Sequence, residues 1–331
     1  MLDVALDTSP LALTRAGTAR YLRELLDALG HEPEVRIHQH SFRARSRLAV
    51  PVRDVGWYLG ALPALARNAD VLHCPTFRAP VRSGVPLVVT FHDLAVLRHP
   101  EAFNAWTRNY SRAVLPRVAR AATRLIAVSA FTAQELVDLL DVPEEKIRVV
   151  RNAVGEPFSP TGQGAEGEYV LAVGTIEPRK NLPALVEGFR RASLNGCELR
   201  IVGRRGWGNV DTPPSDGVRW LGEVSDAELA RLYRGARCTA YVSLYEGFGL
   251  PVLEAMACGS AVVAADLPPI HEFAAGVVTV DPHDPDSIAA GLTEALSRRE
   301  ELGREGRRAA AGLDWPRVAR DTVAVYREVA A

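Results

Sequence analysis

Ser243-Leu-Tyr-Glu-Gly-Phe-Gly-Leu-Pro-Val-Leu-Glu-Ala-Met-Ala-Cys-Gly259 is the stretch of this 331-residue chain that decides its fold. The apolar run before it, residues 238–242, is typical of a buried strand. Two glycines follow in a loop, Pro251 suits the first position of a helix, and Gly259 suits the residue that ends it. A strand, a glycine loop and a helix N-terminus in this order present backbone N–H groups and a positive dipole end, which favours a bound phosphate.

Two carboxylates, Glu246 and Glu254, stand on either side of this loop. A carboxylate repels a phosphate, but it accepts hydrogen bonds from sugar hydroxyl groups. An acidic residue in the first turn of a helix is also common without any ligand, because it complements the dipole. The residues alone therefore leave a purely structural role open.

The segment from Glu246 to Glu254, with the Ala-Met-Ala-Cys-Gly that follows, resembles the paired-glutamate motif of the retaining glycosyltransferases of family 4 (glycosyl transferases group 1). The resemblance implies the GT-B fold, in which two Rossmann-like, doubly wound α/β domains face each other across a cleft. It also implies that Glu246 contacts the donor sugar and that Glu254 holds the nucleotide ribose. Backbone N–H groups between them would meet the sugar and diphosphate, at Gly247, Phe248, Gly249 and Leu250.

The composition is that of a globular protein, with 24% charged and 47% hydrophobic residues, and the length suffices for two domains. A net charge of −1 gives no argument for nucleic acid as a partner. The four cysteines form no CxxC pair, which favours reduced thiols and a cytoplasmic location. No apolar run reaches the roughly 18 residues that span a membrane, and residues 1–7 read as a first strand instead of a signal peptide.

The chain begins as a doubly wound α/β domain, with a strand over residues 2–6, a loop containing Gly17 and Thr18, and a helix over residues 19–29. The loop has no GxGxxG pattern, so it is not a dinucleotide fingerprint. The family resemblance implies that Gly17 and Thr18 reach the donor phosphates and the acceptor. A tight turn without a ligand is the alternative.

A second candidate site follows the buried strand predicted at residues 86–91, whose carboxyl end carries His92 and Asp93. Ligands collect at that edge of open α/β sheets. The run Val-Val-Thr-Phe-His-Asp-Leu resembles the histidine segment of one subgroup of the family. The resemblance implies that His92 positions the donor sugar or the acceptor, with Asp93 as an orienting group.

The segment Gly174-Thr-Ile-Glu-Pro-Arg-Lys-Asn-Leu182 leads from another strand into a helix and carries Arg179 and Lys180. Only one other lysine, Lys146, occurs in the chain. The segment resembles the arginine–lysine diphosphate site of the family, which implies that Arg179 and Lys180 bind the donor phosphates. Many members have an arginine directly after the glycine, where this chain has Thr175. Two solvated basic residues are the alternative.

The family resemblance also implies that the backbone at Glu223 and Val224 contacts the nucleotide base. The glycines of Gly203-Arg-Arg-Gly206 match no phosphate-binding spacing. Asp284-Pro-Asp286 has the DxD spacing of metal-dependent glycosyltransferases, but it precedes a predicted helix and is better explained as a cap. The family resemblance implies a transfer that needs no metal ion, so we expect neither a metal ion nor another cofactor.

Proline and glycine residues near position 160 indicate a linker. We expect an acceptor-side domain over residues 1–160, a nucleotide-sugar-binding domain over residues 161–312, and a terminal helix over residues 313–331 that packs back on the first domain. Arginines cluster in one early segment, at Arg36, Arg43, Arg45, Arg47 and Arg53. Such a segment is usually a solvated loop, and the alternative is contact with an anionic membrane surface or acceptor.

Together these features predict a retaining, metal-independent hexosyltransferase of bacterial type. It would move a hexose, for which mannose from GDP-mannose is the favoured choice, to a glycan, a glycolipid or another small acceptor. The sequence offers no clear nucleophile, so we expect attack on the same face of the sugar as the leaving group. The alternatives are a non-catalytic sugar- or nucleotide-binding scaffold of the same fold, and a glycan phosphorylase with pyridoxal phosphate on Lys146.

Overall fold

The computed structural model describes residues 1–13, 17–43, 49–206, 210, 216–273 and 275–331. Contacts divide the chain into two compact units. The first comprises Met1–Arg98, Asn104–Asn152 and Asp314–Ala331, and the second comprises His99–Phe103 and Ala153–Leu313. The division thus falls at Asn152 and not near residue 160, because Ala153 and the linker after it pack with the second unit.

The first unit contains a parallel sheet of six strands in the order β2-β1-β3-β4-β5-β6. Its central strands are continuous apolar runs, as expected for strands that are covered on both faces. The strands are β1 (Leu2–Asp7), β2 (Val35–His40), β3 (Val71–Cys74), β4 (Leu87–Phe91), β5 (Arg124–Ala127) and β6 (Ile147–Val149). The helices that belong to this unit are α1 (Ser9–Leu13), α2 (Gly17–Gly30), α3 (Ala49–Pro51), α4 (Leu62–Leu65), α5 (Ala95–Arg98), α6 (Ala105–Ala121), α7 (Ala130–Leu140) and α14 (Trp315–Ala330).

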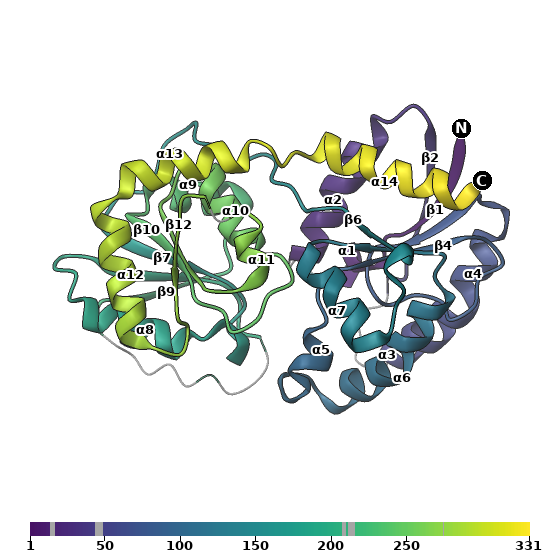
Figure 1. Cartoon of the computed structure of the whole chain (residues 1–331), viewed down its shortest axis with the longest axis horizontal. Helices are drawn as coiled ribbons and strands as arrows, with labels where there is room; N and C mark the ends of the chain where they lie inside the picture. The colour runs from purple at the N-terminus through teal and green to yellow at the C-terminus, as the bar shows by residue number, and fades with distance from the viewer. Residues whose placement is uncertain (14–16, 44–48, 207–209, 211–215, 274) are drawn as a thin grey trace. The chain divides into compact units, whose positions relative to one another are not determined.

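The last helix, α14, belongs to the first unit and packs against α2 (Figure 1, where α14 is yellow and α2 purple). Its buried Tyr326 hydroxyl lies 2.6 Å from Nδ1 of His73 in β3. The other ring nitrogen of His73 lies 2.9 Å from the hydroxyl of Thr90 in β4. Burial lowers the pKa of His73 to about 3, so the imidazole is neutral and connects the end of the chain to the sheet by uncharged hydrogen bonds.

One helical region of the first unit differs from the prediction. A continuous run of helical turns begins at Ala49, inside the region that the sequence analysis treated as an arginine-rich loop, and includes a π-helix over Val52–Ala61. Inside it the carboxylate of Asp54 is fully buried and accepts hydrogen bonds from Arg53 at 2.7 Å and from the indole of Trp106 at 3.0 Å. Burial by itself raises the pKa of Asp54, but Arg53 and Arg78 outweigh it and the pKa is lowered. This buried ion cluster is a tertiary feature, and the periodicity of the helix contains no trace of it.

The second unit contains another parallel six-stranded sheet, in the order β12-β11-β10-β7-β8-β9. Its strands are β7 (Tyr169–Val173), β8 (Glu198–Val202), β9 (Val218–Gly222), β10 (Cys238–Tyr241), β11 (Val262–Ala265) and β12 (Val277–Val280). Its helices include α8 (Leu182–Ala192), α9 (Asp226–Gly235), α10 (Leu250–Ala257), α11 (Pro268–His271), α12 (Pro285–Ser297) and α13 (Arg299–Ala310). Apolar residues of α8 and α12 share one core with the strands.

The sequence patterns predict neither β12 nor α13. The strand β12 has only four residues, and the buried face of α13 consists of Leu302, two glycines and Ala310, so a single large apolar residue marks it. Both units thus have the predicted doubly wound α/β architecture.

Candidate functional site

The candidate site lies in the second unit, at the carboxyl edge of the sheet where the loops after β7 and β10 diverge. The strand order reverses between these two neighbours, and ligands of open α/β sheets bind at such a switch point. The loop after β7 carries Arg179 and Lys180, and the loop after β10 carries Glu246. The backbone N–H of Leu244 donates to the carbonyl oxygen of Arg179 at 2.8 Å, so the two loops are joined directly.

Glu246 and Lys180, which were predicted from separate segments, form an ion pair. Nζ of Lys180 donates to Oε1 of Glu246 at 2.6 Å, and Nη1 of Arg179 lies 3.4 Å from Oε2. Burial alone raises the pKa of Glu246, but the two cations outweigh it and lower the pKa to about 2. Glu246 is therefore an anion at any physiological pH.

Lys180 is also held by an aromatic side chain that the sequence analysis did not identify. Its Nζ donates to the hydroxyl of Tyr241 at 2.8 Å and lies 4.8 Å from the centre of the Tyr241 ring. Burial lowers the pKa of Lys180, although the charge of Glu246 opposes that change. Tyr241 ends β10, and that position at the carboxyl end of a buried strand is the signal that could have identified it.

Arg179 donates hydrogen bonds to residues of both loops. Its Nε and Nη2 donate to Oε1 of Glu177 at 3.1 and 2.9 Å, and its Nη1 donates to the carbonyl oxygen of Tyr245 at 2.9 Å. Glu177 is buried and was not among the predicted site residues, although it lies in the quoted segment just before Pro178. Arg179 therefore connects the segment that carries Lys180 to the segment that carries Glu246.

The glycine loop is built as the sequence indicated. Gly249 has φ of 102°, and a Cβ there would lie 2.7 Å from Cδ1 of Ile270, so a side chain does not fit. Phe248 is buried and its ring centre lies 5.1 Å from that of Phe273. Gly247 is also buried, and Leu250 begins α10.

The sequence analysis treated Glu254 as a residue of the first helical turn. The structure places it beyond the first turn of α10, because the helix begins at Leu250. Its side chain is buried, and Oε2 accepts a hydrogen bond from the hydroxyl of Tyr233 at 3.2 Å. Tyr233 comes from α9, so the second glutamate of the motif ties α10 to the neighbouring helix.

Glu223 and Val224 follow β9 at the same carboxyl edge of the sheet, immediately before Ser225 caps α9. Glu223 is exposed and Val224 is half-buried. β8 separates β9 from β7 in the sheet, so these two residues flank the switch point without joining the ion-pair cluster.

The remaining predicted residues belong to the first unit, and His92 is the most constrained of them. Its Nε2 lies 2.9 Å from the carbonyl oxygen of Pro75, which only accepts, so Nε2 carries the proton and Nδ1 is left as an acceptor. Burial lowers the pKa of His92, and the edge of the Tyr21 ring packs against it at 4.7 Å. Asp93 does not orient His92, because its Oδ1 accepts from the backbone N–H of Ala95 at the start of α5.

Gly17 and Thr18 form the first residues of α2, whereas the prediction placed them in the preceding loop. Gly17 is exposed and Thr18 half-buried. Residues 14–16, immediately before them, and Arg45 and Arg47 of the arginine-rich segment lie outside the described residues.

Two alternative interpretations of single residues can be compared with the structure. Nζ of Lys146 donates to the carbonyl oxygens of Ala119 and Arg120 at 2.8 Å each, near the end of α6. Oδ1 of Asp284 accepts from the backbone N–H of Asp286 at 2.9 Å, which confirms the predicted cap of α12.

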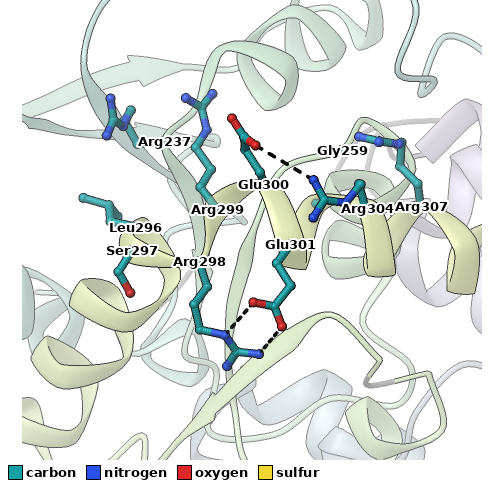
Figure 2. A pocket seen from close by; sticks show the side chains of 11 residues that line it. Arg237, Gly259, Leu296, Ser297, Arg298, Arg299, Glu300, Glu301, Arg304 and Arg307 are labelled. Atoms are coloured by element: carbon teal, nitrogen blue, oxygen red, sulfur yellow. Dashed lines mark hydrogen bonds and ion pairs between the residues drawn. The ribbon is translucent and has the colours of Figure 1, made fainter.

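A pocket of about 880 Å³ lies elsewhere in the second unit, lined by residues of α12 and α13 and by residues that precede two strands (Figure 2). Arg237 and Gly259 place it near the amino ends of β10 and β11, away from the carboxyl edge that carries the motif residues. Its carboxylates pair with its own arginines, as Figure 2 shows for Glu301 with Arg298 at 2.9 Å. We therefore assign the site to the switch point and not to this pocket.

Among the described residues, no helix combines the length and apolarity required to cross a bilayer. Within the same residues, no three histidine, cysteine or acidic side chains are grouped as metal ligands would be.

Comparisons with known proteins identify the family of the chain. The family Glycosyl transferases group 1 matches residues 158–311, and Glycosyltransferase Family 4 matches residues 16–155. O-antigen chain mannosyltransferase B of Escherichia coli is 31% identical over 283 residues, covering 78% of this chain and 74% of that protein. O-antigen chain mannosyltransferase RfbU of Salmonella typhimurium is 32% identical over 224 residues, covering 63% of this chain and 62% of that protein.

Solved structures share the fold at low sequence identity. Sucrose-phosphate synthase from Thermosynechococcus elongatus superposes with a TM-score of 0.77 at 19% identity, covering 99% of each chain. HepE of Anabaena, solved in complex with UDP-glucose, gives a TM-score of 0.78 at 16% identity, covering 99% of this chain and 100% of that one. The chain therefore belongs to the family 4 (group 1) glycosyltransferases and is a transferase of the GT-B fold.

Proposed function

We propose that this glycosyltransferase moves a hexose from a nucleoside-diphosphate sugar to a glycan or glycolipid acceptor, with retention of configuration and without a metal ion. The favoured hexose is mannose, with GDP-mannose as donor, because two similar proteins are named O-antigen chain mannosyltransferases. The binding of UDP-glucose by the structurally similar HepE supports a nucleotide sugar as the donor class.

The observation that carries the proposal is the contact of Lys180 and Arg179 with Glu246 at the switch point. Transfer of a sugar from a nucleotide releases a diphosphate, whose developing charge must be stabilised. Lys180 is a half-buried cation next to the loop that leads into α10, whose N-terminus adds a positive partial charge. Cations and helix dipole together can take the place of a metal ion.

The ionised state of Glu246 limits what it can do. With a pKa of about 2 it has no proton to donate near neutral pH, so it cannot act as a general acid. Its two oxygens can accept hydrogen bonds from sugar hydroxyl groups and so orient the donor. Because Lys180 and Arg179 already neutralise it, Glu246 is also a poor nucleophile, which favours attack of the acceptor on the face that the diphosphate leaves.

The first experiment is hydrolysis and binding across a panel of nucleotide sugars, with and without a chelator. We expect one donor to be turned over equally well in both conditions. NMR of the released or transferred sugar during the first minutes of reaction should detect the anomer of the donor. Loss of turnover on chelation, or the opposite anomer, would contradict metal independence or retention.

Two other functions give different results in the same assays. A non-catalytic scaffold would bind a nucleotide sugar and never release the nucleoside diphosphate. A glycan phosphorylase would carry pyridoxal phosphate and absorb above about 400 nm, but Lys146 already donates to two carbonyl oxygens at the end of α6. Its position near a helix end suits a structural role.

The proposal includes a peripheral contact with an anionic membrane surface on the cytoplasmic side. Val52, Val55 and Leu59 are exposed on successive turns of the helical region that begins at Ala49, and the exposed Arg43 precedes it. Arg53 is not available for this contact because it pairs with Asp54. Co-sedimentation with anionic vesicles should fall in a Val52→Ser/Val55→Ser variant and not in Val149→Ser, an exposed valine of β6.

A further inference from the structure

The ion-pair cluster at the switch point has no spare positive charge. Its two cations, Arg179 and Lys180, face two carboxylates, Glu177 and Glu246, so the formal charges cancel. Each phosphate of a nucleoside diphosphate brings at least one further negative charge. The residue directly after Gly174, in the same loop, is the uncharged Thr175. Besides Arg179, Lys180 and the dipole of α10, a donor diphosphate would therefore be bound more strongly with further cations from another part of the unit.

The loop that follows β8 runs directly beside this position. The backbone N–H of Ile176 donates to the carbonyl oxygen of Arg204, and that of Gly206 donates to the carbonyl oxygen of Ile176, both at 3.0 Å. Ile176 and Arg205 form an isolated parallel bridge. The segment Gly203–Gly206 is thus an extension of β8 that pairs with the donor-side loop after β7.

Two glycines make this close approach possible. A Cβ on Gly203 would lie 1.8 Å from the carbonyl oxygen of Gly174, and a Cβ on Gly206 would lie 2.5 Å from Cγ2 of Thr175. Neither position tolerates a side chain without movement of the paired segment. The spacing of these glycines matches no phosphate motif, but it fixes Arg204 and Arg205 next to Thr175.

Both arginines are exposed, and among the described residues neither guanidinium has an ion pair or hydrogen bond. Arg200 of the same strand behaves differently, since it pairs with Glu198 at 3.0 Å and stacks on the Tyr169 ring at 3.9 Å. Arg191 of α8 is likewise paired, with Glu187 at 2.7 Å. Arg204 and Arg205 are therefore cations at the carboxyl edge, and no carboxylate of the described part of the chain pairs with either of them.

We propose that Arg204 and Arg205 bind the diphosphate of the nucleotide-sugar donor and supply the charge that Thr175 does not. This assignment rests on the proposed function, because it takes its ligand from the glycosyl-transfer reaction. A guanidinium suits the role because its planar N–H groups can bind two phosphate oxygens at once. The competing interpretation is that both are solvated surface arginines with no ligand.

The test is the dissociation constant for GDP and for UDP, measured calorimetrically with the full chain at low and at raised salt. Arg204→Gln/Arg205→Gln should raise the Kd of the tighter nucleotide about tenfold, the factor that corresponds to about 1.4 kcal/mol, and should weaken its salt dependence. The control is Arg304→Gln/Arg308→Gln on α13, which removes the same charge near the amino edge of the sheet and should leave the Kd unchanged. Arg204→Lys/Arg205→Lys keeps the charge without the planar fork and should give an intermediate Kd.

The outcomes separate this inference from the proposed function. If the wild type binds a nucleotide and the folded glutamine variant binds it as well as the control does, the arginine assignment is wrong and the donor class stands. An equal loss of affinity in the α13 control would also overturn the assignment, because a long-range charge effect would then suffice. If the wild type binds neither nucleotide, the proposed function and this inference fail together.

Discussion

Each unit has a buried carboxylate at or next to the switch point of its sheet, and the two have opposite electrostatic surroundings. Asp7 ends β1, which lies where the order of the first sheet reverses, and Glu246 follows β10 at the reversal in the second. Asp7 is 0% exposed and Glu246 is 8% exposed, so burial is nearly the same. The two carboxylates differ in the groups that form hydrogen bonds and ion pairs with them.

Asp7 has only uncharged partners among its hydrogen bonds. The Ser9 hydroxyl donates to Oδ1 at 2.5 Å and the Tyr58 hydroxyl donates to Oδ2 at 3.0 Å. Burial therefore raises the pKa of Asp7, although these hydrogen bonds oppose it. Around Glu246, Lys180 and Arg179 reverse the effect of burial and lower the pKa to about 2. Adjacent cations, and not depth, decide whether a buried carboxylate stays ionised.

The largest expected effect is that of removing the cation closest to Glu246. Lys180→Ala should lower kcat/KM at least about 100-fold, because it removes stabilisation of the leaving diphosphate. The matched control is Lys146→Ala, the only other lysine, which should retain transfer activity. Initial rates with a saturating acceptor test this, and normal turnover in a folded Lys180→Ala protein would contradict the site assignment.

Glu246→Gln keeps the size of the side chain and removes its charge. We expect a loss of roughly 100-fold in kcat/KM, since Lys180 and Arg179 lose their shared anion and the donor loses an acceptor for its hydroxyl groups. Glu187→Gln, on the exposed surface of α8, removes a charge of the same sign and should leave the rate unchanged. Equal rates in both variants would contradict the role of Glu246.

The two carboxylates should respond to pH with opposite signs. The pKa of Glu246 is lowered from 4.5, so its contribution to stability is present above that pH and lost as pH falls towards about 2. The pKa of Asp7 is raised from 3.8, so its contribution is present below that pH and lost as pH rises through the raised value. Each change amounts to about 1.4 kcal/mol per pH unit within its window.

Urea unfolding midpoints measured from pH 3 to pH 8 test these signs. The midpoint of Asp7→Asn should increase relative to that of the wild type as pH rises above about 4. The midpoint of Glu246→Gln should increase relative to that of the wild type as pH falls below about 4.5. A shift of the same sign in both variants would show that the two environments do not differ as described.

The smallest expected effect is the loss of one neutral partner of Asp7. Tyr58→Phe removes the hydroxyl that donates to Oδ2 and should cost about 1 kcal/mol in the free energy of unfolding. It should also raise the pKa of Asp7 further, because the hydrogen bond favours the ionised form. Titration of the Asp7 carboxyl carbon by NMR in both proteins measures that shift, and an unchanged pKa would contradict it.

Sequence reasoning was most successful where one local pattern decides the outcome. Continuous apolar runs predicted the central strands, and Asp284 was predicted as the cap of α12, which the structure confirms. It was least successful where contacts between residues far apart in the chain determine the local structure. The carboxylate of Asp54 in the π-helix is buried and accepts a hydrogen bond from Trp106, which lies 52 residues further along the chain.

The two α/β sheets and the glycine loop before α10 could be predicted from the sequence, because they depend on apolar runs and on residue types at fixed local spacing. The resemblance to the family added Glu246, Lys180 and Arg179 as candidate site residues. The structure was needed to show that Arg179 binds Glu177 and the backbone of Tyr245, that Tyr241 donates no charge but contacts Lys180, and that Arg204 and Arg205 lie beside Thr175. These contacts join separate strands at one sheet edge, and the distances across that edge follow from strand order, which no local pattern encodes.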